Sequence, residues 1–166
     1  MNLVKVFIHG LESSSHGTKA MFFKRRYADM IVEDFHGTLD QRMARLNALL
    51  SDNTSVIIVG SSFGGLMAAI FALENPRRVT KLILLAPALT FQGFESYLQR
   101  RLDIPVTVYH GKKDDIISLA TVYDVARRVF ADLTFNTVDD GHALKNTFPY
   151  MDWDHLLETG PAFRRG

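Results

Sequence analysis

The chain has 166 residues, of which 47% are hydrophobic and 22% are charged, and this balance is typical of one soluble globular domain spanning 1–166. The formal net charge is only +1, from 19 basic and 18 acidic residues, which argues against a nucleic-acid-binding surface. The absence of cysteine excludes disulfides and a cysteine nucleophile and fits the cytoplasmic location that we expect, and no apolar run is long enough for a membrane span.

Strand-like and helix-like segments alternate along the whole chain. The first apolar segment contains Lys5 and lacks a small-residue cleavage site, so it predicts a strand and not a signal peptide. In chain order, the pattern predicts a strand over 3–8, a helix over 18–27, a strand over 30–35, a helix over 38–50 capped by Thr38, a strand over 55–61, a helix over 63–74, strands over 81–87 and 106–111, a helix over 118–131, a strand over 133–140 and a helix near 150–158.

Six strands that alternate with helices predict a three-layer α/β fold, in which helices cover both faces of a mainly parallel sheet. Binding and catalytic sites in such folds form at the carboxyl ends of the strands. The residues whose side chains suggest catalytic chemistry all follow predicted strands, namely His9, Ser62, Asp114 and His142. We therefore expect them to meet at one edge of the sheet.

The segment GSSFGG (60–65) follows a strand that is apolar on both faces, and it fits the G-x-S-x-G pattern of a nucleophile elbow. A dinucleotide-binding fingerprint requires a glycine at 62, and a phosphate-binding P-loop requires a lysine where Leu66 stands. Both of these alternatives are therefore excluded. The pattern alone fits a glycine-rich structural turn equally well.

The two adjacent serines differ in their neighbours. In an elbow, the residues two before and two after the nucleophile come too close together to carry side chains. For Ser62 these neighbours are Gly60 and Gly64, whereas for Ser61 they would be valine and phenylalanine. The predicted nucleophile is therefore Ser62.

A serine hydroxyl needs a base, usually a histidine that a carboxylate holds in place. If the acid and then the base follow the elbow in the chain, only His142 and His155 lie late enough. His155 belongs to a predicted helix and is expected at the surface. His142 follows the last predicted strand, in a loop where Gly141 permits a tight turn, and is the predicted base.

The acid is expected after the strand at 106–111. Asp114 is preferred because Ile117, three residues later, can anchor the turn that aims it, and Asp115 is the alternative. Asp139 and Asp140 lie too near His142 in the sequence to orient it, and one of them could instead cap the loop.

The oxyanion that develops during acyl transfer needs backbone N–H donors. The Phe63 N–H, at the start of the helix after the elbow, is one expected donor. The second is the Leu11 N–H, in the loop after the first strand. The preceding His9 is expected to pack beneath this loop as a structural residue.

With FIHGLESS, GSSFGG, HGKKDDII and DDGHAL in this order, the chain resembles the α/β-hydrolase superfamily over about 3–158, and in particular the small, lidless bacterial serine esterases of the YqiA-like kind. The resemblance implies a minimal α/β-hydrolase fold, with Ser62, Asp114 and His142 as a catalytic triad. It also implies little or no lid, because the segment at 88–103, a short residual cap, is the only insertion. Leu89, Phe91, Phe94, Tyr97 and Leu98 could cover the site or serve in packing.

We therefore expect a serine hydrolase that cleaves small-molecule carboxylic esters, with short acyl chains, through an acyl-enzyme and without a cofactor or metal. A thioesterase or a small-amide hydrolase would use the same triad. A non-catalytic binding protein on a hydrolase scaffold is the alternative from another functional class. The sequence does not indicate the oligomeric state.

Overall fold

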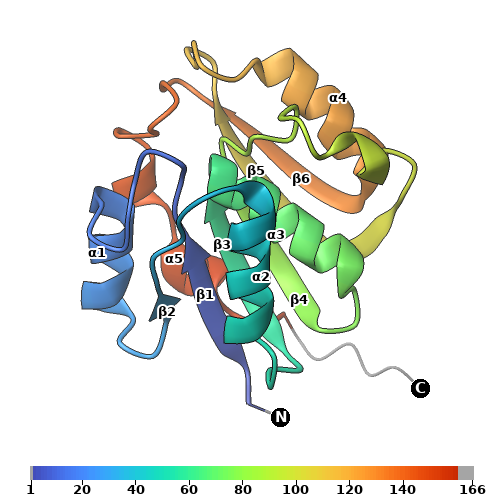
Figure 1. The fold of residues 1–166 in the computed structure, drawn as a ribbon. Coiled ribbons are helices and arrows are strands. Elements are labelled where there is room, and N and C mark those ends of the chain that lie inside the picture. Colours follow the sequence, from blue (N-terminus) through green and yellow to red (C-terminus); the bar gives the residue numbers. More distant parts are fainter. Residues whose placement is uncertain (1, 161–166) are drawn as a thin grey trace.

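A computed structural model describes residues 2–160 of the chain (Figure 1). Its elements are β1 (Val4–Ile8), α1 (Thr18–Arg26), β2 (Ile31–Val32), α2 (Leu39–Leu49), β3 (Val56–Ser61), α3 (Phe63–Glu74), β4 (Val79–Leu85), the 3-10 helix η1 (Glu95–Tyr97), β5 (Leu102–Gly111), α4 (Leu119–Val129), β6 (Phe130–Val138), the 3-10 helix η2 (Phe148–Tyr150) and α5 (Trp153–Leu156).

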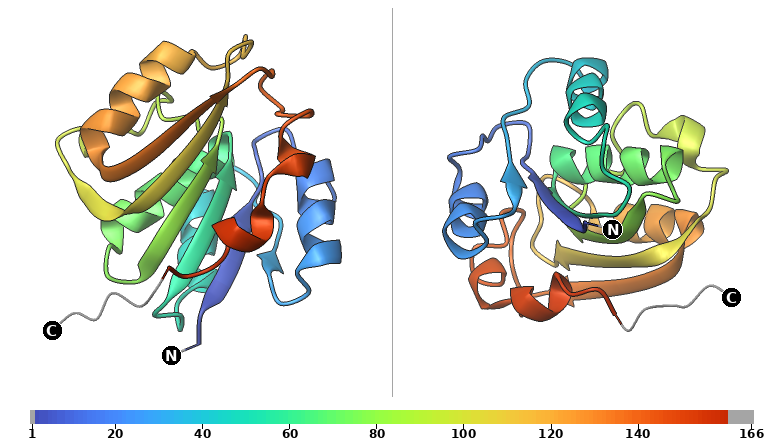
Figure 2. Two further views of the ribbon diagram at one scale, coloured as in Figure 1. Left: turned by 180° about the vertical axis from the view of Figure 1, so that it is seen from behind. Right: turned by 90° about the horizontal axis from the view of Figure 1, so that it is seen from below.

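The six strands form one parallel sheet in the order β2-β1-β3-β4-β5-β6. Buried side chains of α2, α3 and α4 share one apolar cluster with one face of the sheet, whereas α1 and α5 pack on the opposite face. Figure 2 shows these three layers from below the sheet. The predicted three-layer α/β fold with a parallel sheet is confirmed.

The centre of the fold is β3 with the following helix, α3. Four successive residues of β3, Val56 to Val59, are fully buried, as expected for a strand covered on both faces. Ala68, Ala69 and Ala72 are also fully buried, and their small side chains let α3 lie close to the sheet. This packing fixes the turn at Ser62 between the two elements.

The second predicted strand, 30–35, is much shorter in the structure, where only Ile31–Val32 pair with β1. The reason is that the backbone of the next residues bonds elsewhere. The Phe35 N–H donates to Nε2 of His9, and the Phe35 side chain is fully buried in the core. The predicted Thr38 cap is present, with a full capping box to Gln41.

The predicted C-terminal helix over 150–158 is also wrong in its extent, because η2 and α5 replace it. Met151 is extended between them, and the Asp152 side chain accepts from the His155 N–H to start α5. Residues 102–103 of the predicted cap belong to β5.

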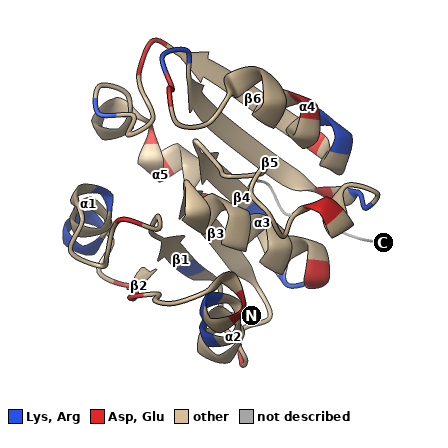
Figure 3. Cartoon of the chain, turned by 45° about the horizontal axis from the view of Figure 1, so that its top comes forward, with Lys and Arg blue, Asp and Glu red and all other residues tan. Residues whose placement is uncertain are grey.

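Lys and Arg are spread over α1, α2 and α4 (Figure 3). None of the described helices combines the length and apolar character needed to cross a membrane.

Candidate active site

The turn between β3 and α3 holds Ser62 in a strained conformation, with φ 55° and ψ −114°. Positive φ is costly for a residue with a side chain and persists only where the surroundings enforce it. Here the Ser62 N–H donates to the Leu85 carbonyl, and the Ser62 carbonyl accepts from Gly65, Leu66 and Ala88. Such a turn matches the geometry of a nucleophile elbow.

Both elbow glycines lie where a side chain could not fit. A Cβ on Gly60 would overlap the Gly64 backbone, which is the close approach predicted from the sequence. A Cβ on Gly64 would instead overlap the carbonyl of Ile8 and come within 2.7 Å of the carbonyl of His9. Gly64 is therefore required because β1 passes against the start of α3.

The structure brings together the three side chains that the sequence analysis selected. Nε2 of His142 lies 3.0 Å from Oγ of Ser62, and Nδ1 of His142 lies 2.8 Å from Oδ2 of Asp114. The Asp114 side chain is fully buried and that of His142 is 23% exposed. The imidazole can therefore accept the serine proton on one side while it donates to the carboxylate on the other.

Asp114 is held by its own turn as well as by His142. Its Oδ1 accepts from the backbone N–H groups of Ile116 and Ile117, at 2.9 and 2.8 Å. Burial raises the pKa of Asp114, but the hydrogen bonds from Ile117, His142 and Ile116 outweigh this effect, and the pKa is lowered. The alternative acid, Asp115, is exposed.

His110, at the end of β5, was not assigned a role by the sequence analysis. Its side chain is fully buried, and Nε2 lies 2.9 Å from the Ile117 carbonyl and 3.2 Å from Oδ2 of Asp114. Because both neighbouring atoms are acceptors, Nε2 carries the proton. His110 thus donates to the turn that presents Asp114. Its position four residues before Asp114 was the available signal.

The loop that carries His142 is built around Asp140, which is 5% exposed. Oδ2 of Asp140 accepts from Asn146 N–H and from both the N–H and the hydroxyl of Thr147, and Oδ1 accepts from Gly141 N–H. Asp140 is thus the predicted loop-capping carboxylate. Asp139 is exposed and pairs with Lys113 instead.

A turn begins at Gly141, whose carbonyl accepts from the Leu144 N–H, but the turn does not require a glycine there. A Cβ on Gly141 would have no neighbour within 4 Å, whereas a Cβ on Gly111 would overlap the Asp140 carbonyl. The loop is also held by α1, where Nζ of Lys19 donates to the Ala143 carbonyl at 2.7 Å.

The segments that carry the two expected oxyanion donors both adjoin Ser62. Phe63 follows it directly, and the loop with Leu11 lies so close that a Cβ on Gly10 would be 3.4 Å from Cβ of Ser62. In the part of the chain that the structure describes, neither backbone N–H makes a hydrogen bond. Neither N–H is therefore occupied by another acceptor within this part of the chain.

His9 is buried beneath this loop, as expected. Nδ1 of His9 donates to the Gly10 carbonyl, and Nε2 accepts from Phe35 N–H, so both ring nitrogens have structural partners. His155, the rejected base, is on α5 with its side chain 81% exposed.

Most of the possible cover residues serve in packing. Leu89 and Phe94 are buried, and the Tyr97 hydroxyl donates to Glu74 on α3. Phe91 is 45% exposed and lies edge-on against the Phe63 ring, with the ring centroids 5.1 Å apart. Leu11 and Ile116 are exposed on neighbouring loops. These three exposed side chains are apolar and come from the loops after β1, β4 and β5.

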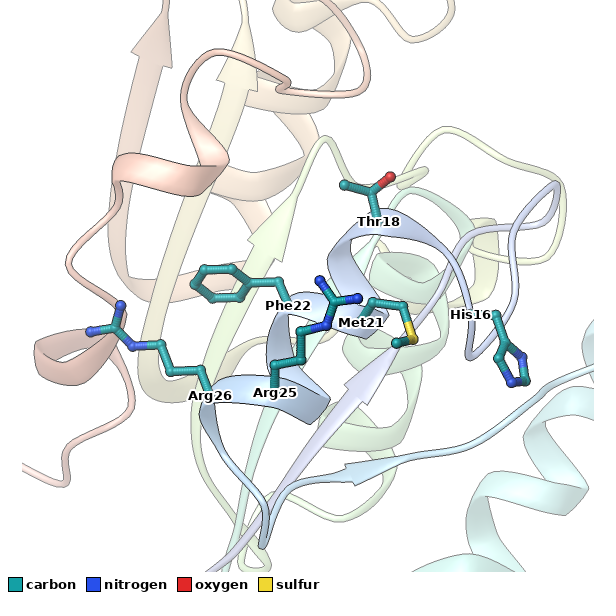
Figure 4. A pocket seen from close by; sticks show the side chains of 6 residues that line it. All are labelled: His16, Thr18, Met21, Phe22, Arg25 and Arg26. Atoms are coloured by element: carbon teal, nitrogen blue, oxygen red, sulfur yellow. The ribbon is translucent and has the colours of Figure 1, made fainter.

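A pocket of about 760 Å³ lies along α1, lined by His16, Thr18, Met21, Phe22, Arg25 and Arg26 (Figure 4). It contains none of the triad side chains. Within residues 2–160, no group of three or more His, Asp or Glu side chains is arranged to hold a metal ion.

Comparisons with known proteins agree with the fold. Residues 23–100 match the family model "Serine aminopeptidase, S33", an α/β-hydrolase family. No curated protein matches the chain.

Three solved structures illustrate the fold similarity. A protein from Agrobacterium vitis S4 is 20% identical, with a TM-score of 0.77, over 94% of this chain and 88% of that one. Mouse alpha/beta hydrolase domain-containing protein 10 is 20% identical, with a TM-score of 0.73, over 85% of this chain and 82% of that one. An alpha-beta serine hydrolase homologue from Coxiella burnetii is 15% identical, with a TM-score of 0.69, over 88% of this chain and 80% of that one.

Proposed function

Because the chain has the fold of the α/β-hydrolases and residues 23–100 match a hydrolase family model, we propose that it is a serine hydrolase that cleaves small-molecule carboxylic esters. The observation that carries the proposal is the chain of hydrogen bonds from Ser62 through His142 to Asp114. A serine, an imidazole and a buried carboxylate in this order supply a nucleophile, a general base and an orienting group.

The proposed reaction has two halves. Oγ of Ser62 attacks the ester carbonyl while Nε2 of His142 takes the hydroxyl proton, and His142 then returns this proton to the leaving alcohol. Water attacks the resulting acyl-enzyme with the same imidazole as base, which releases the acid and restores Ser62. Asp114 holds the Nδ1–H tautomer throughout and stabilises the imidazolium.

The oxyanion formed in each half is proposed to accept from the Leu11 and Phe63 N–H groups. These donors are free of other hydrogen bonds in the described residues, and Phe63 begins a helix of 12 residues whose dipole favours negative charge. Loss of one such donor typically lowers the rate by about 10²–10³-fold. These steps use only this chain, water and the substrate, so we propose no cofactor.

We further propose that the whole chain acts as one α/β-hydrolase domain in which 88–103 is a short residual cap. The packing of Leu89, Phe94 and Tyr97 into the fold supports this, since it leaves little to cover the serine. An open site has few contacts for a long acyl chain. The enzyme should therefore prefer short acyl groups.

The proposal is tested by measuring kcat/KM for p-nitrophenyl esters with acyl chains of increasing length. We expect turnover to decline from short to long chains. Comparable turnover across the series would contradict the short-chain preference. A matched thioester and anilide measured beside the best ester decide between ester, thioester and amide hydrolysis, which the triad alone does not distinguish.

A further inference from the structure

The first turn of α2 contains a buried cation that has no anionic partner. Arg42 is only 5% exposed, and Nε donates to the Gly37 carbonyl at 3.0 Å. Nη1 is buried without any hydrogen-bond partner. Among the described residues, no carboxylate forms an ion pair with Arg42, whereas Arg45, one turn later, is half exposed and pairs with Glu33.

This arrangement is energetically unfavourable for the protein alone. A buried charge is normally paired, because the attraction to a partner offsets the free energy lost when the ion leaves water. Without a partner, this desolvation cost is not offset. The same desolvation lowers the pKa of Arg42. Nη1 of Arg42 is therefore free to donate to a group that is not part of this chain.

Arg42 packs against the residue that follows the proposed catalytic serine. Its guanidinium is 5.2 Å from the centroid of the Phe63 ring, and Phe63 directly follows Ser62. Burial lowers the pKa of His9 and its hydrogen bond to the Gly10 carbonyl raises it. The positive charge of Arg42 lowers this pKa further, and the carboxylate of Asp34 raises it, so both charges act on the His9 loop.

The helices α2 and α3 both begin at this edge of the sheet, after β2 and β3. Their N-termini add positive partial charge to that of the guanidinium. The corner between α2, Phe63 and the His9 loop thus combines the guanidinium with two helix N-termini. The nearby carboxylates of Asp34 and Asp40 form no ion pair with Arg42 in the described residues.

We propose that Arg42 binds an anionic oxygen group, a carboxylate or a phosphate, that the substrate carries in addition to the bond attacked by Ser62. This inference rests on the proposed function, and it narrows the substrate class to acidic esters. A guanidinium pairs well with either group because its planar N–H donors match two oxygens. Such charge-assisted contacts favour a bound group by about tenfold to a hundredfold.

The test compares esters that differ only in this charge. On the acyl side, mono-p-nitrophenyl adipate is compared with its neutral methyl ester, and a p-nitrophenyl hexanoate carrying a terminal phosphate forms the phosphate arm. On the alcohol side, 4-carboxyphenyl butyrate is compared with its methyl ester. Each kcat/KM is measured at pH 7 for the wild type, Arg42→Met, Arg42→Lys and the control Arg45→Met.

We expect the wild type to prefer the anionic member of at least one pair by about tenfold or more. Arg42→Met should abolish this preference while neutral esters are still cleaved. Arg42→Lys should keep part of it, since lysine retains the charge but not the planar fork. Arg45→Met should keep all of it, because the same charge is removed from the same helix at a paired, exposed position. If Arg42→Met does not fold, the comparison with Arg42→Lys carries the test.

An anionic-to-neutral ratio that is the same in the wild type and in the Arg42 variants would overturn the proposal, including when all rates fall together. If the wild type cleaves no ester, the proposed function fails instead. The anion site is then judged from the Tm measured with adipate or with inorganic phosphate. A rise in the wild type that is absent in Arg42→Met supports the site, and no rise overturns it.

Discussion

The carboxylate of Asp114 accepts a hydrogen bond from Nδ1 of His142 at 2.8 Å, although 28 residues separate the two in the chain. Asp114 follows β5 and His142 follows β6, and these strands lie side by side at the edge of the sheet. The pairing of β5 with β6 therefore determines the distance between the proposed acid and base.

Replacement of Asp114 by asparagine should lower kcat by about 10³–10⁴-fold with little change in KM. The asparagine oxygen would accept from Ile116 and Ile117, and its amide group would then face Nδ1 of His142. The imidazole would carry its proton on Nε2 and could no longer accept from Ser62. Asp115→Asn is the matched control and should retain nearly full activity. The opposite ranking of the two variants would reassign the acid.

The carboxylate of Asp140 should contribute stability that depends on pH. Burial raises the pKa of Asp140, but hydrogen bonds from Thr147, Gly141 and Asn146 outweigh this effect, and the pKa is lowered. A group whose pKa is lowered on folding stabilises the protein above its unfolded value of about 3.9, and this stability is lost as the pH falls through the folded value.

Asp140→Asn should therefore destabilise the protein by about 2–3 kcal/mol at pH 7, as expected for lost hydrogen bonds to a charged group. Denaturant unfolding from pH 7 to pH 3 should show this difference shrinking below about pH 4. Asp139→Asn, which removes only an exposed ion pair, should change stability by about 1 kcal/mol or less. A difference for Asp140→Asn that stays constant with pH would contradict the assignment.

The two glycines beside the proposed site should respond differently to alanine. Gly64→Ala would drive a methyl group into the carbonyl of Ile8, so it should abolish activity and prevent stable folding. Gly141→Ala places its methyl group in open space and should leave Tm and kcat/KM close to the wild-type values, even though residue 141 adjoins His142. A folded, active Gly64→Ala protein would show that β1 does not pass against α3 as described.

His110 is predicted to position Asp114. His110→Leu would remove the donor to the Ile117 carbonyl and loosen the turn that holds the carboxylate. We expect kcat to fall by about tenfold with KM unchanged, since an unpaired buried carbonyl costs about 1–3 kcal/mol, part of which reaches the active geometry. His110→Gln, whose amide nitrogen can replace Nε2, should recover part of kcat. Equal losses of stability in both variants with kcat unchanged would make His110 purely structural.

Local patterns in the sequence were sufficient for the main features of this site. Gly60 and Gly64 distinguish Ser62 from Ser61 because the elbow brings together residues that are close in the chain. The alternation of strands with helices places Asp114 and His142 at strand ends. The same patterns predicted all six strands and the N-terminal cap at Thr38.

The features that were missed depend on contacts between distant segments. The close approach in the His142 loop involves Gly111 and the Asp140 backbone, which come from neighbouring strand ends, and not Gly141. The shortening of the second strand results from the bond between His9 and Phe35, 26 residues apart. The burial of Arg42 depends on where α2 packs, and a charged residue in an amphipathic helix gives no local signal of burial.

The central claim is that Ser62 is the nucleophile, and covalent labelling with a fluorophosphonate probe tests it most directly. The wild type and the Ser61→Ala control should be labelled, with the adduct on Ser62 by peptide mass spectrometry, and Ser62→Ala should not be labelled. Labelling that persists in Ser62→Ala, or that maps to another residue in the wild type, would contradict the claim.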